Sequence, residues 1–526
     1  MKTRSIAKRA AGAAAAVAAL ALLAGCGGAE TPSGDQSTGA AGSPGAADPA
    51  GGALVVGVTS DVDTLFPWKA TQFNTVNVMQ VIYGTLTEFD QDLNVAPGIA
   101  ESWEISDDRL TLTFHLRQGV KFADGSDCDS ADVKFSLDKI ADEATAAVAR
   151  AQLSSIASVA APDAATVVLN LTSPDAGLVS SLASINVAIL SSDDTEEALN
   201  ETPNGTGPFK LKERKPSQSL TLERNGNYWG DPAKLDTVEF RVIPDETSIV
   251  TAMQSGNVHL AVFDDPLVAE SAETSANAVI QEQAQLAYHV LQLNATKGEL
   301  TDVNVRLAIQ CAIDRQQVLD AAALGEGAIT GPITSPAFRS DPSARPCPDR
   351  DLDKAAEYLA KAGKADGIKL KVMVSQGEYA TSVNEAQSIQ AQLADAKIEV
   401  ELEVLESGAY VDRWLAADFD AAVALNGGRP DPDQAYSRYF TSTGNLNAVA
   451  GFSSPELDRL FAEGRSSASK EERESIYTEI SSILEDNAAW VWLFTSYTYT
   501  ATTADVSGYV PMANDSMQYL RTTALG

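Results

Sequence analysis

Residues 98–140 read GIAESWEISDDRLTLTFHLRQGVKFADGSDCDSADVKFSLDKI. Within this stretch, residues 110–116 alternate strictly between apolar and polar side chains, with Leu110, Leu112, Phe114 and Leu116 on the apolar face. Alternation with a period of two is typical of a strand that buries one face. A helix is expected soon after Cys128. The stretch therefore predicts a half-buried strand followed by a helix.

Helix and strand patterns alternate through the rest of the chain as well. Residues 383–393 repeat apolar side chains at helical spacing, and residues 398–406 then alternate as a strand with its glutamates facing outward. Two further helices carry start signals: a proline follows the cap residue Ser454, and Ser469 stands three residues before Glu472 in a capping box. We find no solenoid-type repeat. The predicted fold class is therefore α/β.

The first 25 residues have the pattern of a secretory signal peptide. A positively charged start precedes the short apolar run of residues 10–24, and such a run is too short to span a membrane stably. The sequence LAGC at residues 23–26 resembles the bacterial lipobox, in which the cysteine is diacylated and becomes the first mature residue. An ordinary signal peptide with an incidental cysteine is the alternative. We predict a signal peptide over residues 1–25 and a lipidated Cys26.

Residues 26–52 are expected to form a flexible linker behind the lipid. After Cys26 they are Gly, Ala, Ser, Pro, Thr and other small or polar residues, which cannot bury enough apolar surface to fold. The folded part then runs from about residue 53 to the end of the chain, roughly 470 residues, which is too long for a single core. Two or three lobes are therefore expected. No other apolar run reaches the length of a membrane span.

Charge and motif content narrow the class of function. The chain has 38 basic and 72 acidic residues and a net charge of −34, which repels nucleic acid and anionic lipid headgroups. Nucleophile-elbow, phosphate-loop and zinc-protease motifs are absent from the sequence. The three histidines, His115, His259 and His289, have no cysteine or carboxylate at metal spacing. Nothing in the sequence argues for an enzyme, and we predict no cofactor and no metal site.

Three cysteines remain beyond residue 26. Cys128, Cys311 and Cys347 match no zinc-binding pattern. Because disulfides form readily in exported proteins, three cysteines indicate one disulfide and one free thiol. Cys347 lies in the proline-rich loop SARPCPDRD, which has no apolar periodicity of its own and would gain most from a covalent link. We predict a Cys311–Cys347 disulfide, with three buried free thiols as the alternative.

Six further blocks accompany residues 98–140 in a recognisable order. They are GTGPFKL (205–211), ERNGNYWG (223–230), MQSGNVHLAVF (253–263), LNATKGELTDVNVRLAIQCAIDR (293–315), YLAKAG (358–363) and GGRPDPDQAY (427–436). With these blocks the chain resembles the extracytoplasmic solute-binding proteins of family 5, the peptide- and nickel-type binding proteins of ATP-driven importers. Each block alone is weak, and their order over about 400 residues is what carries the resemblance.

The resemblance implies a two-lobed periplasmic-binding-protein fold of the class II type. Lobe I would span residues 53–290 plus 496–526, with an extra subdomain at about 86–200, and lobe II would span 291–495. A hinge of two strands would join the lobes, and we map its strands onto HVLQLN (289–294) and WVWLFTSYTYT (490–500).

The resemblance also implies a function: a substrate-binding lipoprotein of an ABC importer. Such a protein, a monomer on the outer face of the cytoplasmic membrane, closes its hinge around a solute and delivers it to separate permease and ATPase subunits. We expect an oligopeptide or peptide-like solute. A lipid-anchored envelope enzyme or chaperone is one alternative, and an importer component for an opine, sugar or other metabolite is another.

The solute-contacting segment departs from the peptide-binding pattern. Peptide-binding members place an aspartate there that pairs with the α-ammonium of the ligand, and aligned on Pro432 this position is Gly428, with Leu425 in place of an aromatic. Recognition of a free α-amine is therefore in doubt. Nickel chelates are less favoured than peptides, opines or sugars.

Arg429 is the leading candidate for contact with the solute. A guanidinium suits a carboxylate or another anionic oxygen group. We expect Tyr436 and Phe66 to form apolar walls of the site, and Asp431 and Trp492 are further candidate ligand contacts. The alternative is that Arg429 pairs with Asp431 or Asp433 at the rim of the cleft.

Overall fold

The computed structural model describes residues 51–376, 379–467 and 469–526. The predicted signal peptide, Cys26 and nearly all of the predicted linker lie outside the described residues. Three main β-sheets organise the described chain, and two smaller ones each pair two short strands: β2 (Thr87–Phe89) with β3 (Val95–Pro97), and β20 (Val506–Ser507) with β21 (Ala524–Leu525).

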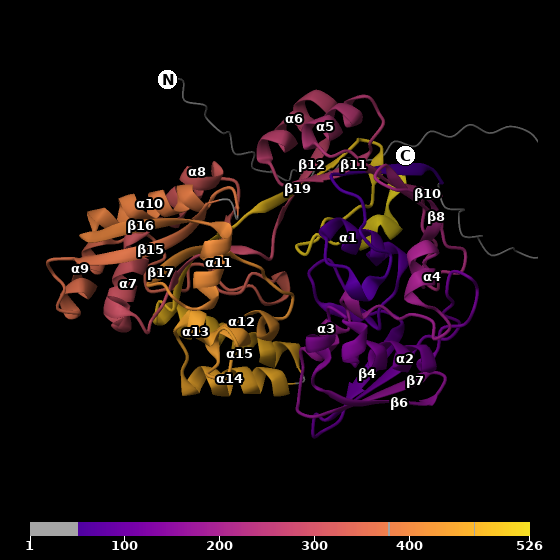
Figure 1. Ribbon diagram of the computed structural model, residues 1–526, viewed down its shortest axis with the longest axis horizontal. Coiled ribbons are helices and arrows are strands. Elements are labelled where there is room, and N and C mark those ends of the chain that lie inside the picture. Colours follow the sequence, from indigo (N-terminus) through magenta and orange to yellow (C-terminus); the bar gives the residue numbers. More distant parts are fainter. Residues whose placement is uncertain (1–50, 377–378, 468) are drawn as a thin grey trace, which may run out of the picture. The chain divides into compact units, whose positions relative to one another are not determined.

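The first large sheet has seven strands in the order β12-β19-β11-β1-β10-β9-β8 (Figure 1). These strands are β1 (Ala53–Val58), β8 (Phe209–Lys215), β9 (Ser219–Arg224), β10 (Thr237–Val242), β11 (Leu260–Phe263), β12 (Val279–Ala284) and β19 (Tyr497–Thr502). β1 lies parallel to both of its neighbours, and the other pairs are antiparallel. We call residues 51–284 and 497–526, which include this sheet, lobe I.

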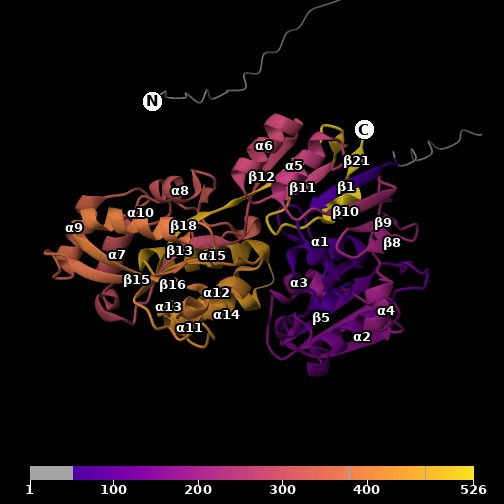
Figure 2. The same ribbon diagram turned by 45° about the horizontal axis from the view of Figure 1, so that its top comes forward.

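Several helices belong to lobe I. They are α1 (Phe73–Ile82), α2 (Ser130–Ala141), α3 (Leu178–Ser181), α4 (Glu196–Glu201), α5 (Glu246–Gln254) and α6 (Pro266–Ala276). α5 and α6 pack on each other and on β11, and α6 also contacts β12 and β19 (Figure 2).

The quoted stretch around residue 110 builds a separate four-stranded sheet in lobe I. Its order is β4-β5-β7-β6, with β4 (Ala100–Ile105), β5 (Thr111–Leu116), β6 (Ile156–Asp163) and β7 (Thr166–Leu171). The predicted strand is β5, and Leu112, Phe114 and Leu116 are buried as the alternation requires. The predicted helix is α2, which begins because the Asp129 carboxylate accepts a hydrogen bond from the N–H of Ala131 at 2.8 Å. Both local predictions are confirmed.

The second large sheet has six strands in the order β14-β18-β13-β17-β15-β16. These strands are β13 (Tyr288–Leu293), β14 (Ala328–Ile329), β15 (Ile368–Gln376), β16 (Ile398–Glu406), β17 (Ala421–Asn426) and β18 (Trp490–Thr495). Its parallel part pairs β15 with β16 and β17. We call residues 288–495, which include this sheet, lobe II.

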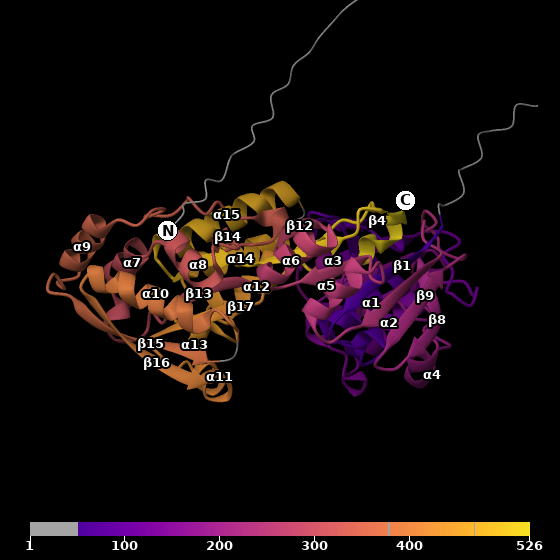
Figure 3. The same cartoon turned by 90° about the horizontal axis from the view of Figure 1, so that it is seen from above.

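Helices cover this sheet and extend beyond it. They are α7 (Val303–Ala312), α8 (Arg315–Ala323), α9 (Leu352–Lys361), α10 (Ser382–Asp395), α11 (Ser407–Leu415), α12 (Pro432–Phe440), α13 (Asn447–Ala450), α14 (Pro455–Ser466) and α15 (Lys470–Asp486). α10 packs against β15, β16 and β17 (Figure 3). The helix predicted at 383–393 and the strand predicted at 398–406 are confirmed as α10 and β16, and Ser454 and Ser469 cap α14 and α15.

Two short links join the lobes. The chain leaves β12, passes through residues 285–287 and enters β13, and it returns from β18 through Ser496 into β19. The links lie side by side: the N–H of Gln285 donates to the carbonyl oxygen of Ser496 at 3.0 Å, and Thr495 Oγ1 lies 2.6 Å from the carbonyl oxygen of Gln285. The predicted first crossing, 289–294, is wrong in position, because the buried strand β13 has already begun at Tyr288.

Candidate functional site

A cleft of about 520 Å³ lies between the lobes, with walls from segments far apart in the sequence. Lobe I contributes α1, the chain around residues 84–89 and 206–208, and the loop at 513–521; lobe II contributes residues 427–430 and Gln434; and the link at 285–287 completes the wall. A concave site of this size that includes a few charged groups has the features of a small-ligand site.

Arg429 lines this cleft from lobe II. It lies in the connection between β17 and α12, its side chain is exposed, and it forms no hydrogen bond or ion pair within the described chain. Although Arg429 is accessible to solvent, the surrounding cleft wall removes part of the water around its guanidinium. This desolvation, followed by the positive charge of Arg438, lowers the pKa of the guanidinium below the ordinary arginine value. The guanidinium therefore faces the cleft without a counter-charge from the described residues.

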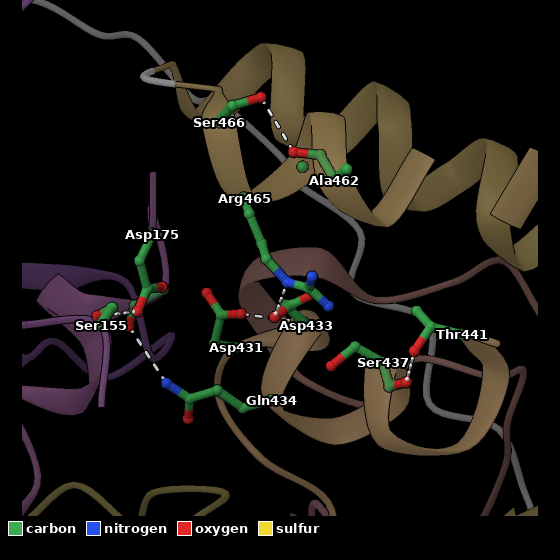
Figure 4. Close-up of polar contacts among 12 residues, drawn as sticks. Ser155, Asp175, Asp431, Asp433, Gln434, Ser437, Thr441, Ala462, Arg465 and Ser466 are labelled. Atoms are coloured by element: carbon green, nitrogen blue, oxygen red, sulfur yellow. Dashed lines mark hydrogen bonds and ion pairs between the residues drawn. The ribbon is translucent and has the colours of Figure 1, made fainter. Parts of the chain in front are cut away.

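The alternative rim pairing of Arg429 is not formed. Asp431 pairs with Arg473 at 2.8 Å. Asp433 pairs with Arg465 at 2.9 Å (Figure 4). Asp431 is also buried and caps α12 by accepting a hydrogen bond from the N–H of Asp433 at 3.0 Å. The carboxylate of Asp431 is therefore engaged inside lobe II and does not line the cleft, so this geometry does not support the predicted ligand contact.

The three predicted aromatic contacts lie in protein cores instead of on the cleft wall. Tyr436 stacks between Tyr288 and Phe440 at ring distances of 5.8 and 6.1 Å. Trp492 is fully buried in β18, and Phe66 is buried beside Trp68 in lobe I. None of the three lines the cleft. This placement does not support the predicted ligand contacts, because burial of apolar surface has put these large aromatic side chains in the cores.

The aromatic side chains that do line the cleft come from lobe I. They are Tyr83, Phe89, Tyr228 and Trp229. The guanidinium carbon of Arg117 lies 4.8 Å from the centroid of the Trp229 ring. This cation–π contact helps to hold the indole in its place on the cleft wall. The sequence NYW at residues 227–229 could have indicated these cleft residues. Two neighbouring aromatic side chains in a polar turn do not follow the apolar periodicity of a buried helix or strand.

Four charged residues line the cleft, and two of them neutralise each other. Arg521 donates to both carboxylate oxygens of Glu88, at 2.8 and 3.0 Å. Arg429 and Asp515 remain. Burial first, and then the negative charge of Asp264, raises the pKa of Asp515 to about 7, against a smaller lowering by its hydrogen bond to Thr498.

The lobes touch directly beside the cleft (Figure 4). Gln434 Nε2 donates to Ser181 Oγ at 2.7 Å and to the carbonyl oxygen of Gly177 at 3.2 Å, while the N–H of Ala176 donates to the carbonyl oxygen of Arg465 at 2.7 Å. Burial raises the pKa of neighbouring Asp175 above its ordinary value. These polar contacts can form and break with lobe movement at little cost in apolar surface.

Gly428 stands where the backbone of lobe II approaches the link between the lobes. A Cβ atom at this position would lie 2.0 Å from the carbonyl oxygen of Leu286, which no side chain tolerates. An aspartate side chain therefore has no room at this position in this structure.

Cys311, on α7, and Cys347 form a disulfide with a Cα–Cα distance of 5.0 Å. Cys128 is a buried free thiol, and burial raises its pKa well above the ordinary value. Within the described residues, no three His, Cys, Asp or Glu side chains group as a metal site, and no helix is both long and apolar enough to cross a bilayer.

Comparison with known proteins identifies the family. The family described as "Bacterial extracellular solute-binding proteins, family 5 Middle" matches residues 94–447, and the chain belongs to this family. Its members are extracellular solute-binding proteins, and the two lobes and three main sheets described above are the fold of such a protein.

Three similar proteins illustrate the range of solutes. Heme-binding protein A of Haemophilus influenzae is 29% identical over 84% of this chain and 86% of its own length. A probable di/tripeptide-binding protein 5 of Pseudomonas aeruginosa is 27% identical over 82% of this chain and 87% of its own. The solved structure of DppA from Helicobacter pylori in complex with the peptide STSA is 27% identical, covers 91% of this chain and 98% of its own, and has a TM-score of 0.69.

Proposed function

We propose that this protein captures an oligopeptide or peptide-like solute in the cleft between its lobes and delivers it to the permease of an ABC importer. The observation that carries the proposal is the cleft of about 520 Å³, bounded by both lobes and holding separate positive and negative groups, in a member of family 5. The relatives named for di/tripeptides and for the peptide STSA support the solute class.

Hinge closure is the mechanism that the geometry supports. Only residues 285–287 and Ser496 connect the lobes covalently, so rotation about two adjacent links can change the width of the cleft. A solute that contacts both walls interacts with more protein in the closed form than in the open form, and it shifts the equilibrium toward closure by that difference in binding free energy.

The direct test is to incubate the purified protein with extract from its own cells and to identify retained compounds by mass spectrometry. Peptides recovered chemically unchanged support both the proposed solute class and a binding role without turnover. Recovery of an opine, a sugar or another metabolite supports the alternative importer. Chemical conversion of the retained compound contradicts the binding role and favours a tethered enzyme.

Replacing Arg429 by alanine is expected to weaken binding of the identified solute about tenfold to a hundredfold. The reason is the loss of a charge-assisted contact worth about 1.5–3 kcal/mol. Calorimetric titration measures the effect. Arg339→Ala, which removes an exposed arginine outside the cleft, is the matched control. An affinity of Arg429→Ala within about twofold of wild type, with an unchanged melting temperature, contradicts an anion contact.

We also propose that residues 1–25 are a cleaved signal peptide and that lipidated Cys26 tethers the folded part through a linker ending near residue 52. Replacing Cys26 by serine is expected to release the protein into the medium, because serine offers no thiol for diacylation. Fractionation of cells and medium followed by immunoblotting measures the release. Retention of the variant in the membrane contradicts the lipid anchor and favours an uncleaved signal anchor.

The domain boundaries are part of this proposal. We propose that lobe I comprises residues 51–284 and 497–526, with an extra subdomain at about 86–200, and that lobe II comprises residues 288–495. The sequence predicted 53–290 plus 496–526 for lobe I and 291–495 for lobe II, and the bounds proposed here follow the ends of β12, β13, β18 and β19. The permease and ATPase are separate chains, and the binding protein acts as a monomer.

A further inference from the structure

Two groups of opposite charge remain unpaired in the cleft, one on each lobe. Arg429 comes from lobe II and Asp515 from lobe I, and neither forms an ion pair with any residue that the structure describes. The other two charges of the cleft, Glu88 and Arg521, satisfy each other. The cleft therefore offers one cationic and one anionic contact from opposite walls.

The loop that carries Asp515 is held in place by α1. Ser516 Oγ donates to Gln80 Oε1 at 2.8 Å, and the N–H of Met517 donates to the same oxygen at 3.1 Å. Asp515 itself has φ of 57°, a left-handed conformation that aspartate tolerates better than most residues. Its carboxylate is thus presented from a fixed backbone and is not on a free loop.

The surroundings of Asp515 favour a cation. Its Oδ1 lies 3.3 Å from Thr498 Oγ1 on β19, and its charged neighbour is another acid, Asp264. A half-buried carboxylate beside a second carboxylate lacks a counter-charge, and an incoming ammonium group would supply one.

We propose, on the basis of the function proposed above, that Asp515 receives an ammonium group of the solute while Arg429 receives its anionic end. The preferred solute is then a zwitterion with a free amine, such as an unblocked peptide. Asp515 supplies from lobe I the negative charge that Gly428 cannot supply from lobe II, because the carbonyl oxygen of Leu286 excludes a side chain there.

This arrangement links charge recognition to closure. The two contacts lie on different lobes, so a zwitterion gains both only when the lobes approach each other across it. A solute with one blocked end gains one contact and stabilises the closed form less.

The test uses a lysine-free library of random tripeptides and the same library after N-acetylation. Wild type is expected to retain free-amine peptides about tenfold to a hundredfold more tightly than their acetylated forms, because acetylation removes one charge-assisted contact. Asp515→Asn is expected to lose this preference by binding free peptides more weakly while binding acetylated peptides unchanged. Asp505→Asn, an exposed aspartate outside the cleft, is the matched control and should keep the preference.

The pH dependence gives a second readout. The groups facing Asp515 are Asp264 after β11, Thr498 on β19 and Tyr509, and none of them is basic. With a pKa of about 7, Asp515 is mostly protonated at pH 6 and mostly ionised at pH 8. Affinity for a free-amine peptide should therefore rise about tenfold from pH 5.5 to 7.5, where peptide α-amines remain largely protonated. Asp515→Asn should remove most of this rise.

The outcomes separate this inference from the proposed function. Equal retention of free and acetylated peptides by wild type overturns the role of Asp515 and leaves peptide binding intact. If wild type retains neither library, the proposed peptide binding is contradicted, and so is the proposed role of Asp515. Because both results come from the wild-type protein, they do not depend on whether Asp515→Asn folds.

Discussion

Replacing Glu485 by glutamine is expected to lower the free energy of unfolding by about 3–5 kcal/mol, because it leaves buried positive charge uncompensated. Glu485, on α15, is only 2% exposed, and its Oε1 lies 3.1 Å from Nη2 of the equally buried Arg345. Gln310 Nε2 donates to its Oε2 at 2.9 Å. A glutamine at residue 485 can still accept the hydrogen bond from Gln310, but it has no negative charge to balance Arg345.

A second guanidinium makes this carboxylate more important. Arg315 is also buried, and its Nε donates to the carbonyl oxygen of Trp492 at 2.9 Å. Burial first, and then the positive charge of Arg345, lowers the pKa of Arg315 to about 9, while Glu485 acts in the opposite direction. Without Glu485 the two guanidinium groups would share one buried region, and only the weaker effects of Asp314 on Arg315 and of Asp341 on Arg345 would oppose their charge.

Urea-induced unfolding measures the predicted loss. Glu479→Gln, on the exposed side of the same helix, is the matched control and should change the free energy of unfolding by less than about 0.5 kcal/mol. A loss of under about 1 kcal/mol for Glu485→Gln would show that water or local rearrangement compensates the two arginines.

Removing the disulfide between Cys311 and Cys347 is expected to cost about 3–4 kcal/mol of unfolding free energy. The two residues are 36 apart in sequence, and closing a loop of that length in the unfolded chain restricts its entropy by about this amount. Both half-cystines are buried in the lobe II core, and the bridge ties the loop before α9 to α7.

Chemical denaturation of the variant with both cysteines replaced by serine measures this effect. Reductant provides the control: it should lower the midpoint of wild type but leave the double variant unchanged, which separates loss of the covalent bond from loss of sulfur packing. Peptide mapping without reductant should recover the two cysteines in one linked peptide. Their recovery as separate alkylated peptides would rule the bond out.

Local sequence patterns predicted local structure well. The strand β5, the pair α10 and β16, and the caps of α14 and α15 each depend on residues within a few positions of one another. The order of family blocks then supported the larger architecture, and the matched family confirms it. The first link between the lobes was predicted at residues 289–294, a few residues C-terminal to its position at 285–287. An apolar strand has the same sequence pattern on either side of a hinge, so the pattern alone does not place the link.

The cleft was predicted less well, for physical reasons. Tyr436 was assigned to the cleft because its segment lines it in relatives, but α12 buries Ala435, Tyr436, Tyr439 and Phe440 as one helical stripe, a spacing that indicates a core face. Asp515 was missed because its neighbours are remote: its loop is held by Gln80, 436 residues away from Ser516. The sequence around residue 515 contains no pattern that predicts a hydrogen bond to a residue so distant in the chain.

The close approach of Gly428 to Leu286 also has an evolutionary consequence. One nucleotide change converts the glycine codons GGT and GGC into aspartate codons, so from either codon an aspartate at this position is a single mutation away. With the carbonyl oxygen of Leu286 only 2.0 Å from the site of a new Cβ, that mutant begins with a clash inside the connection that must bend. Any side chain introduced at residue 428 would therefore require the backbone of the link to move before that side chain could serve a ligand.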